Sequence, residues 1–532
     1  MQRGMLAAVC ALVFVVYVYV AHSGLPVSWG PGAADDYYNL LVQGFHAGQL
    51  SLKIDVPPGL AQLADPYDRK ANAAYGLLDL SYYKGRLYLY FGVTPALVLF
   101  WPYAAVTGDY LSQTGATLVF CVVGFLMGAG LLCALWRRYF ADVSVWVVAT
   151  GMLALGLANG APLLLAWCYV WEVPISCGYA LTMLALAAIW KALHGADRRG
   201  CWWLTAGSLA YGLALGARPS LLFGSVILLV PMLAARRKLR DVGVALVAGI
   251  GPIMVIGLGL MAYNWLRFDR PLEFGVRYQL AGDRELTRQF FSLRFLWFNF
   301  RAYFLGMAQW SGRFPFVHGV NLPTPPAGHG RVEHPFGILT NIPVVWLALA
   351  APLALRGRSG NARPLLGGFL TVVAVMFGIV TLTLGSFYYV AGRYQVEFLP
   401  ALVLLAVAGI LSLERILAGQ PLRRCGARVF WGLLLAFSVA FSVLASVGRC
   451  AQGHYYLGMS LQRVGRVQEA IGQYEQAVLI NPNYAEAHYN EGVALEQAGR
   501  TQEAIEHYEQ ALRIKPDFVE AQNALARLRT AQ

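Results

Sequence analysis

The segment Met5–Ala21, MLAAVCALVFVVYVYVA, is an unbroken apolar run preceded by one charged residue, Arg3. A helix that crosses the hydrocarbon core of a bilayer needs about 20 apolar residues, with about 17 at the lower end of the range. The apolar core of a secretory signal is shorter than this run. The segment therefore predicts an uncleaved membrane anchor, and the residues after it are expected to face the outside of the cell.

The remainder of the chain has the composition of a membrane protein. Of its 532 residues, 58% are hydrophobic and 13% are charged, and the mean hydropathy is +0.53. These values are far from those of a soluble globular protein. Ten further segments are apolar and long enough to span: Thr114–Trp136, Val143–Trp167, Val173–Leu193, Trp202–Ala217, Pro219–Ala235, Val242–Leu266, Phe336–Leu355, Leu365–Val390, Phe398–Leu413 and Val429–Val447. Together with the first, they predict an all-α polytopic fold of about 11 transmembrane helices.

The arginines and lysines predict the direction of the spans. Leu87–Val106 is also apolar, but counting it as a span would reverse the side of every later loop. Without it, the short loops on the N-terminal side hold 17 arginines and lysines and those on the other side hold three. Because basic residues concentrate in cytoplasmic loops, the N-terminus is expected inside and the C-terminus outside. Leu87–Val106 then lies along or dips into the outer face, and the net charge of +13 reflects topology rather than nucleic-acid binding.

Two long segments fall on the outer side, His22–Gln113 and Arg267–Pro335. The second contains the aromatic-rich stretch Phe290–Trp310, which is typical of an amphipathic helix at the membrane interface. Glu172 interrupts an otherwise apolar region, and an acid is costly inside a bilayer, so Glu172 is expected at a surface. Residues 1–450 form the predicted transmembrane domain.

The last 82 residues, 451–532, follow a different pattern. QEAIGQYEQAVLINP (Gln468–Pro482) recurs as QEAIEHYEQALRIKP (Gln502–Pro516) after 34 residues. This helix–turn–helix period, with small residues where paired helices meet and a proline that ends each unit, resembles tetratricopeptide repeats (TPR). The sequence predicts two repeats and a capping helix, with a protein partner as their expected ligand.

Asp35 and Asp36 follow the first span directly, in the sequence ADDYY. An ionised carboxylate at a membrane surface can accept a proton from a sugar or lipid hydroxyl, and a neighbouring acid raises the affinity for a divalent cation. A solvated pair of loop acids is the alternative. Eight cysteines include no CxxC pair, so the sequence indicates neither a redox motif nor a cysteine metal site. His318, His329, Glu333 and His334 lie in a Pro/Gly-rich stretch that is expected to be a plain loop.

The early outer acids, the tyrosine after them and a glycine further on resemble the start of C-type (GT-C) membrane glycosyltransferases, which include protein O-mannosyltransferases and aminoarabinose transferases. The resemblance implies that Asp35 is the catalytic base and Asp36 its companion. Further short motifs follow in the family's order, in YYKGRLYLYFGVTPALVLFWPY, GLALGARPSLLF and AGRYQVEFLPAL. On these and on an acid between two spans, it implies substrate-binding roles for Lys84, Arg86, Glu172, Arg218, Arg393 and Tyr394.

The implied activity is transfer of a sugar from a polyprenyl-phosphate donor to an acceptor at the outer face of a bacterial inner membrane. A carboxylate would take the proton of the attacking hydroxyl, and arginines or lysines would stabilise the departing phosphate. A single base acting on the acceptor predicts inversion at the anomeric carbon. No cofactor beyond the lipid-linked donor is expected, and a divalent metal is left open.

Three other classes of protein remain as alternatives. An O-antigen ligase or polymerase would depend on a late outer loop such as Arg267–Pro335. A transporter would place ionisable residues at mid-membrane and show repeated halves, whereas these spans are almost free of charge. A membrane-anchored TPR scaffold without catalysis would tolerate replacement of the outer acids and arginines.

Overall fold

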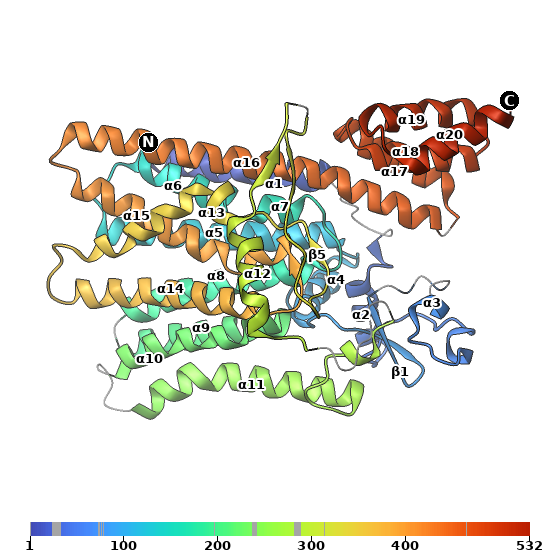
Figure 1. The fold of residues 1–532 in the computed structure, drawn as a ribbon. Coiled ribbons are helices and arrows are strands. Elements are labelled where there is room, and N and C mark those ends of the chain that lie inside the picture. The colour runs from blue at the N-terminus through green and yellow to red at the C-terminus, as the bar shows by residue number, and fades with distance from the viewer. Residues whose placement is uncertain are drawn as a thin grey trace.

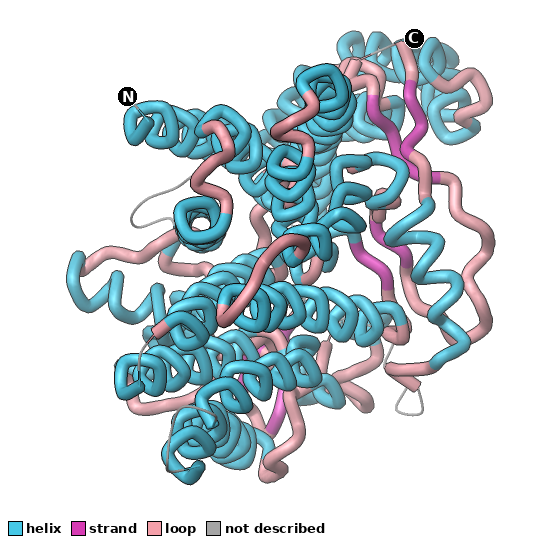
Figure 2. Tube along the Cα trace, turned by 90° about the vertical axis from the view of Figure 1, so that its left-hand side faces the viewer, coloured by secondary structure: helices cyan, strands magenta, loops and turns pink. Residues whose placement is uncertain are grey.

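The computed structural model describes residues 2–23, 33–72, 75, 77, 79–195, 197–236, 242–280, 289–312, 314–463 and 465–531. Long helices run side by side in a bundle, and a group of short helices near the C-terminus is set off at one end (Figure 1). Figure 2 looks at the same molecule from the end that carries the N-terminus, where many of the long helices are seen nearly end-on.

Within the described residues, eight helical segments are long and apolar enough to cross a membrane. Helices suit this environment because they satisfy every backbone hydrogen bond internally. The segments are α1 (Gln2–Ser23), α5 (Gln113–Tyr139), α6 and α7 (Val145–Leu157 and Ala161–Leu165), α8 (Glu172–His194), α11 (Val242–Phe268), α14 (Ala362–Gly385), α15 (Leu399–Ile416) and α16 (Pro421–Arg463). The chain is therefore mostly helical, with several helices typical of a membrane protein.

Three of the expected spans are not among these eight segments. Helix α9 (Asp197–Ala217) packs between α8 and α11. Pro219–Ala235 begins as the 3₁₀ helix η5 (Pro219–Leu228) and continues into α10 (Leu229–Arg236). The 3₁₀ helix η9 (Pro343–Leu355) has 13 residues. At a rise of about 2.0 Å per residue it extends about 26 Å, close to the core thickness of about 30 Å. The number of transmembrane segments therefore stays a prediction.

Leu87–Val106 does not form a spanning helix. It begins in strand β2 (Arg86–Leu89), which pairs antiparallel with β1 (Leu80–Tyr83). Only its second half is helical, as a π-helical turn (Ala96–Phe100) followed by α4 (Trp101–Thr107). Such a helix covers about 18 Å, too little to cross a bilayer.

The second outer segment differs from the expected single amphipathic helix. In Phe290–Trp310 the helical part is short and changes type along its length: the 3₁₀ helix η7 (Leu293–Phe295), α12 (Leu296–Phe300) and a π-helical turn (Arg301–Leu305). The stretch ends in strand β3 (Ala308–Trp310). The reason is that Phe298, Ala302, Tyr303 and Phe304 pack into the core of the bundle. The remaining short elements in the described residues are α2 (Tyr37–His46), η2 (Leu60–Gln62), α3 (Arg69–Asn72), η6 (Val276–Tyr278), α13 (Ile338–Asn341), η10 (Gly392–Glu397), β4 (Val317–Val320, antiparallel to β3), and the parallel pair β5 (Val332–Glu333) and β6 (Val390–Ala391).

The loops between helices alternate between the two ends of the bundle. At the end that carries the N-terminus, Tyr139 Oη lies 2.8 Å from His194 Nε2, and Arg358 donates a hydrogen bond to the Tyr139 carbonyl. Tyr139 and His194 are the last residues of α5 and α8, and Arg358 follows η9. The charge pattern places these three helix ends on one side. Helices α2 and α3, strand β1 and the C-terminal helices lie at the opposite end (Figure 1). The orientation across the membrane stays a prediction, and the basic residues 237–240 lie outside the described residues.

The C-terminal helices are joined to the bundle without a break. Helix α16 has 43 residues, or about 65 Å, roughly twice the thickness of a bilayer core. The expected boundary between 450 and 451 falls inside it, so the first helix of the first repeat continues the last membrane helix. The other repeat helices are α17 (Val467–Ile480), α18 (Ala485–Gln497), α19 (Thr501–Ile514) and α20 (Val519–Ala531).

Contacts between the repeats and the bundle fix the tail at this end. His454 Nε2 lies 3.2 Å from the Ser23 carbonyl oxygen, and Asn483 Nδ2 donates to the Phe314 carbonyl at 3.0 Å. The tail is therefore held against the end of the bundle that carries α2.

Candidate functional site

Asp36 and Asp35 have different surroundings. Asp36 occupies the N-cap position of α2 and is partly buried. Its carboxylate accepts a hydrogen bond of 3.0 Å from the Gln113 N–H at the start of α5 rather than from α2 itself. Burial raises the pKa of Asp36 to about 6, against the opposing effect of the Gln113 bond. Asp35 is exposed. The structure therefore holds Asp36 in one position, whereas Asp35 faces solvent.

Four charged residues from distant parts of the chain, three of them buried and one half-buried, meet near this end of the bundle. The Arg393 guanidinium on η10 pairs with the Glu333 carboxylate on β5. Arg449 Nη2 on α16 lies 3.5 Å from Glu172 Oε1 at the start of α8. Arg393 is also close enough to Glu172 and Arg449 to influence both electrostatically. These four side chains therefore form one cluster, which we call the arginine–glutamate cluster.

Glu172 was expected at a surface but is fully buried. It is the first residue of α8, and its Oε2 accepts a hydrogen bond of 3.1 Å from the Tyr169 N–H. A helix N-terminus favours negative charge, and Arg449 supplies a countercharge. The acid is therefore tolerated inside the protein because it is paired and hydrogen-bonded. Its expected position at the membrane surface, rather than at mid-bilayer, stays a prediction.

A second ion pair lies beside the cluster. Arg218 Nη2 is 2.5 Å from Glu397 Oε1, and Ser220 Oγ donates to Glu397 Oε2 at 2.6 Å. The Tyr394 ring lies 4.9 Å from the Arg218 guanidinium and 5.4 Å from that of Arg393. The structure thus brings together Arg218, Arg393 and Tyr394, three residues that the sequence singled out.

Lys84 and Arg86 do not join them. Lys84 occupies the turn between β1 and β2 with a φ of +47°, followed by Gly85 at +73°. Its Nζ lies 2.7 Å from Asp269 Oδ2, and the Lys84 side chain is 68% exposed. Arg86, the first residue of β2, is exposed as well. Lys84 and Arg86, for which the resemblance implied substrate-binding roles, therefore lie apart from the two arginines, because the tight turn directs this hairpin tip to solvent.

Asp79 is an acid at this end that sequence reasoning missed. It precedes β1 with a φ of +60°, and Gln279 Nε2 lies 3.5 Å from its Oδ1. Burial raises the pKa of Asp79 to about 6, although a hydrogen bond from Trp171 and the charge of Arg393 act in the opposite direction. Glu333 behaves differently from Asp79. Burial raises the pKa of Glu333, but Arg393, Tyr389 and Arg449 together lower it by more, so the net shift is downward.

Tyr169 lies near three of the acids. Burial raises the pKa of Tyr169, and Asp79, Asp36 and Glu172 add to the shift, so each of these carboxylates is close enough to influence Tyr169 electrostatically. The Tyr169 ring lies 4.9 Å from the Trp171 ring. Asp36 therefore belongs to the same region as the arginine–glutamate cluster.

Aromatic rings cover the guanidinium groups of the cluster. The Arg393 guanidinium lies 5.2 Å from the Trp171 ring centre, and that of Arg449 lies 5.3 Å from the Trp167 ring. Trp167 also stacks on Tyr456, with ring centres 5.2 Å apart and planes inclined by 4°. Since Arg449 and Tyr456 both belong to α16, the helix that leads into the repeats forms one wall of the site.

Two arginines in the cluster keep an unused donor. The Nε atoms of Arg393 and Arg449 are buried and have no hydrogen-bond partner within the described chain. A buried donor without a partner costs about 1–3 kcal/mol. An anionic ligand could satisfy both donors.

The histidine-containing loop does not gather into a metal site. His318 Nε2 lies 2.8 Å from Ser311 Oγ, His329 Nε2 lies 3.0 Å from Asn299 Oδ1, and Glu333 pairs with Arg393. Within the described residues, no group of three potential metal ligands forms in this loop.

Comparison with known proteins identifies the tail. Residues 455–517 match the family model of the tetratricopeptide repeat, which confirms the repeats predicted from the 34-residue period. Such repeats commonly mediate contacts between proteins. No curated protein matches the chain.

Two solved structures are similar to parts of the chain. The crystal structure of MamA matches 23% of this chain and 77% of its own, with 25% identity and a TM-score of 0.16. The oligosaccharyltransferase of Archaeoglobus fulgidus, tethered to an acceptor peptide with an NVT sequon, matches 87% of this chain with 13% identity and a TM-score of 0.42. The match spans 58% of that oligosaccharyltransferase. Likenesses this weak carry no argument about activity, which we base on the site.

Proposed function

We propose that this chain is a membrane glycosyltransferase that moves a sugar from a polyprenyl-phosphate donor to an acceptor hydroxyl, at the end of the bundle that carries Asp36. The observation that carries the proposal is the meeting of fixed carboxylates with buried arginines at one end of an apolar helix bundle. The arginines can bind the phosphate of a lipid-linked donor, and a carboxylate can accept the proton of the acceptor hydroxyl.

The donor phosphate would bind at the arginine–glutamate cluster. The partnerless Nε donors of Arg393 and Arg449 can each donate to a phosphate oxygen. Glu333 and Glu172 hold the two side chains in place beforehand, so little reorganisation is needed when charge develops on the leaving phosphate. The aromatic rings around them exclude water and strengthen these interactions.

The acceptor would be activated by Asp36. A general base works best when its pKa lies near the working pH, and a value of about 6 leaves Asp36 ionised at neutral pH yet basic enough to take a proton. The family resemblance implied Asp35 as the base, but the Asp35 side chain is exposed. The proposal therefore assigns the base to Asp36 and leaves Asp35 a supporting role.

In the reaction, the acceptor oxygen attacks the anomeric carbon and its proton passes to Asp36. The bond between that carbon and the phosphate oxygen breaks, and the electron pair leaves with the phosphate, where Arg393 and Arg449 stabilise the added charge. Attack from the side opposite the phosphate inverts the anomeric centre. The location in a bacterial inner membrane, with this end outside, is part of the proposal and rests on the charge bias of the loops.

A second candidate, an O-antigen ligase or polymerase, is favoured by one observation. Glu333 comes from the late outer segment and pairs with Arg393, so that segment also contributes to the cluster. In this candidate, Glu333→Gln would abolish activity and Asp36→Asn would be tolerated.

The experiment that tests the proposal compares Asp36→Asn with Asp35→Asn, using purified chain in nanodiscs and polyprenyl-phosphate sugars as donors. Asparagine keeps the size of the side chain and removes the base. Turnover in Asp36→Asn should fall by about 10²–10⁴-fold while donor binding is retained. Asp35→Asn is the matched control and should stay within a few-fold of the unmodified chain. Normal turnover in Asp36→Asn would refute the assignment.

A further inference from the structure

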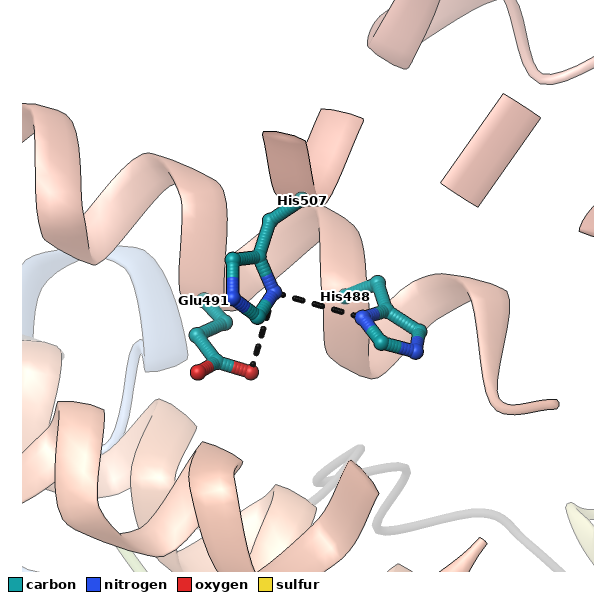
Figure 3. Close-up of side chains that lie close together, drawn as sticks. All are labelled: His488, Glu491 and His507. Carbon is teal, nitrogen blue, oxygen red and sulfur yellow. Dashed lines mark hydrogen bonds and ion pairs between the residues drawn. The ribbon is translucent and has the colours of Figure 1, made fainter. Parts of the chain in front are cut away.

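Three side chains of the second repeat converge away from the proposed transfer site. His488 and Glu491 lie three residues apart on α18 and so share one face of the helix. His507 reaches them from α19 (Figure 3). His488 and Glu491 are buried, with 8% and 3% of their surface exposed, and His507 is partly buried.

The distances between their ligand atoms match a small coordination site. His488 Nδ1 lies 3.2 Å from His507 Nδ1, and His507 Nδ1 lies 3.3 Å from Glu491 Oε2. All three atoms lie within 4.8 Å of one another. In a tetrahedral zinc site with bonds of about 2.0–2.1 Å, neighbouring ligand atoms are about 3.3 Å apart. Two edges of the tetrahedron are therefore already formed.

The tautomer of His488 is determined by its neighbour. Its Nε2 lies 3.2 Å from the Pro482 carbonyl oxygen. Because a carbonyl can only accept, Nε2 carries the proton and the lone pair is on Nδ1, which faces His507. A ligand histidine typically donates its other N–H to a carbonyl in this way. Glu491 Oε2 is buried and has no hydrogen-bond partner in the described chain, so it also presents a free lone pair to the same point.

The first repeat provides an internal comparison. The equivalent residues, 34 positions earlier, are His454, Leu457 and Gln473. There His454 Nδ1 lies 2.8 Å from Gln473 Oε1, so an ordinary hydrogen bond completes the pair. The second repeat has His507 in place of Gln473 and Glu491 in place of Leu457. The repeat fold does not need these two side chains, and together they supply the second and third ligands.

We propose that His488, Glu491 and His507 bind one Zn²⁺ ion, with a fourth position open to water or to a ligand atom of a bound protein. Two imidazoles and a carboxylate are a ligand set that suits zinc. The ion would cross-link α18 and α19. This stabilises an array of two repeats, which is shorter than the three or so that usually stand alone. The inference is independent of the sugar-transfer proposal, since its residues lie outside the transfer site.

The test measures metal binding by the full chain in detergent after treatment with a chelator. Zinc content, competition with a chromophoric zinc chelator and the visible spectrum of the Co²⁺ form are recorded. The variant Glu491→Leu/His507→Gln carries the residues of the first repeat, so it should keep the fold. His454→Gln is the matched control in the first repeat.

We expect the unmodified chain and His454→Gln to bind one Zn²⁺ at micromolar or lower concentration and to give the strong visible bands of tetrahedral Co²⁺. The double variant should lose at least about 100-fold in affinity and lose those bands. Zinc should also raise the unfolding temperature of the repeats in the unmodified chain and leave that of the variant unchanged. Binding only at millimolar zinc, or equal affinity in the double variant, would overturn the proposal. If the double variant fails to fold, His507→Gln alone decides by the same criteria.

Discussion

Replacement of Arg449 by methionine tests the pairing that joins the repeat-bearing helix to the site. The change keeps most of the side-chain volume and leaves Glu172 without its nearest countercharge. With Arg449 Nη2 3.5 Å from Glu172 Oε1, an effective dielectric of about 20 gives an interaction of about 5 kcal/mol. Removing one partner of a buried pair costs about 3–5 kcal/mol. Because Arg393 also acts on Glu172, we expect the lower end, about 3 kcal/mol.

The double variant Glu172→Gln/Arg449→Met separates this loss from a simple packing defect. Glutamine can still accept the hydrogen bond from the Tyr169 N–H, and no buried charge is left alone. Most of the lost stability should therefore return. The free energy of unfolding is measured in mixed micelles with increasing sodium dodecyl sulfate, followed by tryptophan fluorescence. Arg466→Met breaks an exposed pair with Glu469 and is the matched control, with no measurable loss expected. Strictly additive losses in the double variant would refute the reasoning.

Three further predictions address the orientation, the phosphate site and the base. Alkaline phosphatase fused after Gln532 should be active and a reporter that works only in the cytoplasm silent; the reverse pattern would contradict the loop-charge argument. Arg393→Lys keeps the charge but loses the planar fork, so donor affinity should weaken about tenfold. Lys84→Ala changes an exposed residue, serves as the control and should have normal donor affinity. If Arg393→Lys and Lys84→Ala bind the donor equally well, Arg393 does not bind the donor phosphate. Transfer should fall about tenfold per pH unit below about 6, because the raised pKa of Asp36 means that it is protonated there; a flat profile down to pH 5 would exclude Asp36 as the base.

Much of the helical architecture could be predicted from apolar length and loop charge. These patterns predicted segments that the structure describes as helices, and the repeat period predicted the tail. The end of the membrane domain could not be located in this way. The composition changes near residue 450, but no proline occurs between Pro421 and Pro482 to stop the helix. Helix α16 therefore continues from the bundle into the first repeat.

The site was only partly predictable, for reasons of charge pairing. Arg218 and Arg393 stood out as isolated cations at helix ends, but their partners Glu397 and Glu333 depend on which loops meet in three dimensions. The role of Asp79 could not be predicted from the sequence. Its position depends on its left-handed backbone conformation and on its burial, and the sequence alone reveals neither.

The central claim is that a lipid-linked sugar phosphate binds between the buried arginines and Asp36. The most direct measurement is an experimental structure of the full chain in nanodiscs with a non-hydrolysable polyprenyl-phosphate sugar. Our account predicts that the phosphate lies within hydrogen-bonding distance of Arg393 Nε and that the sugar extends towards Asp36. A phosphate bound at the exposed hairpin of Lys84, with the arginine–glutamate cluster unchanged, would contradict it.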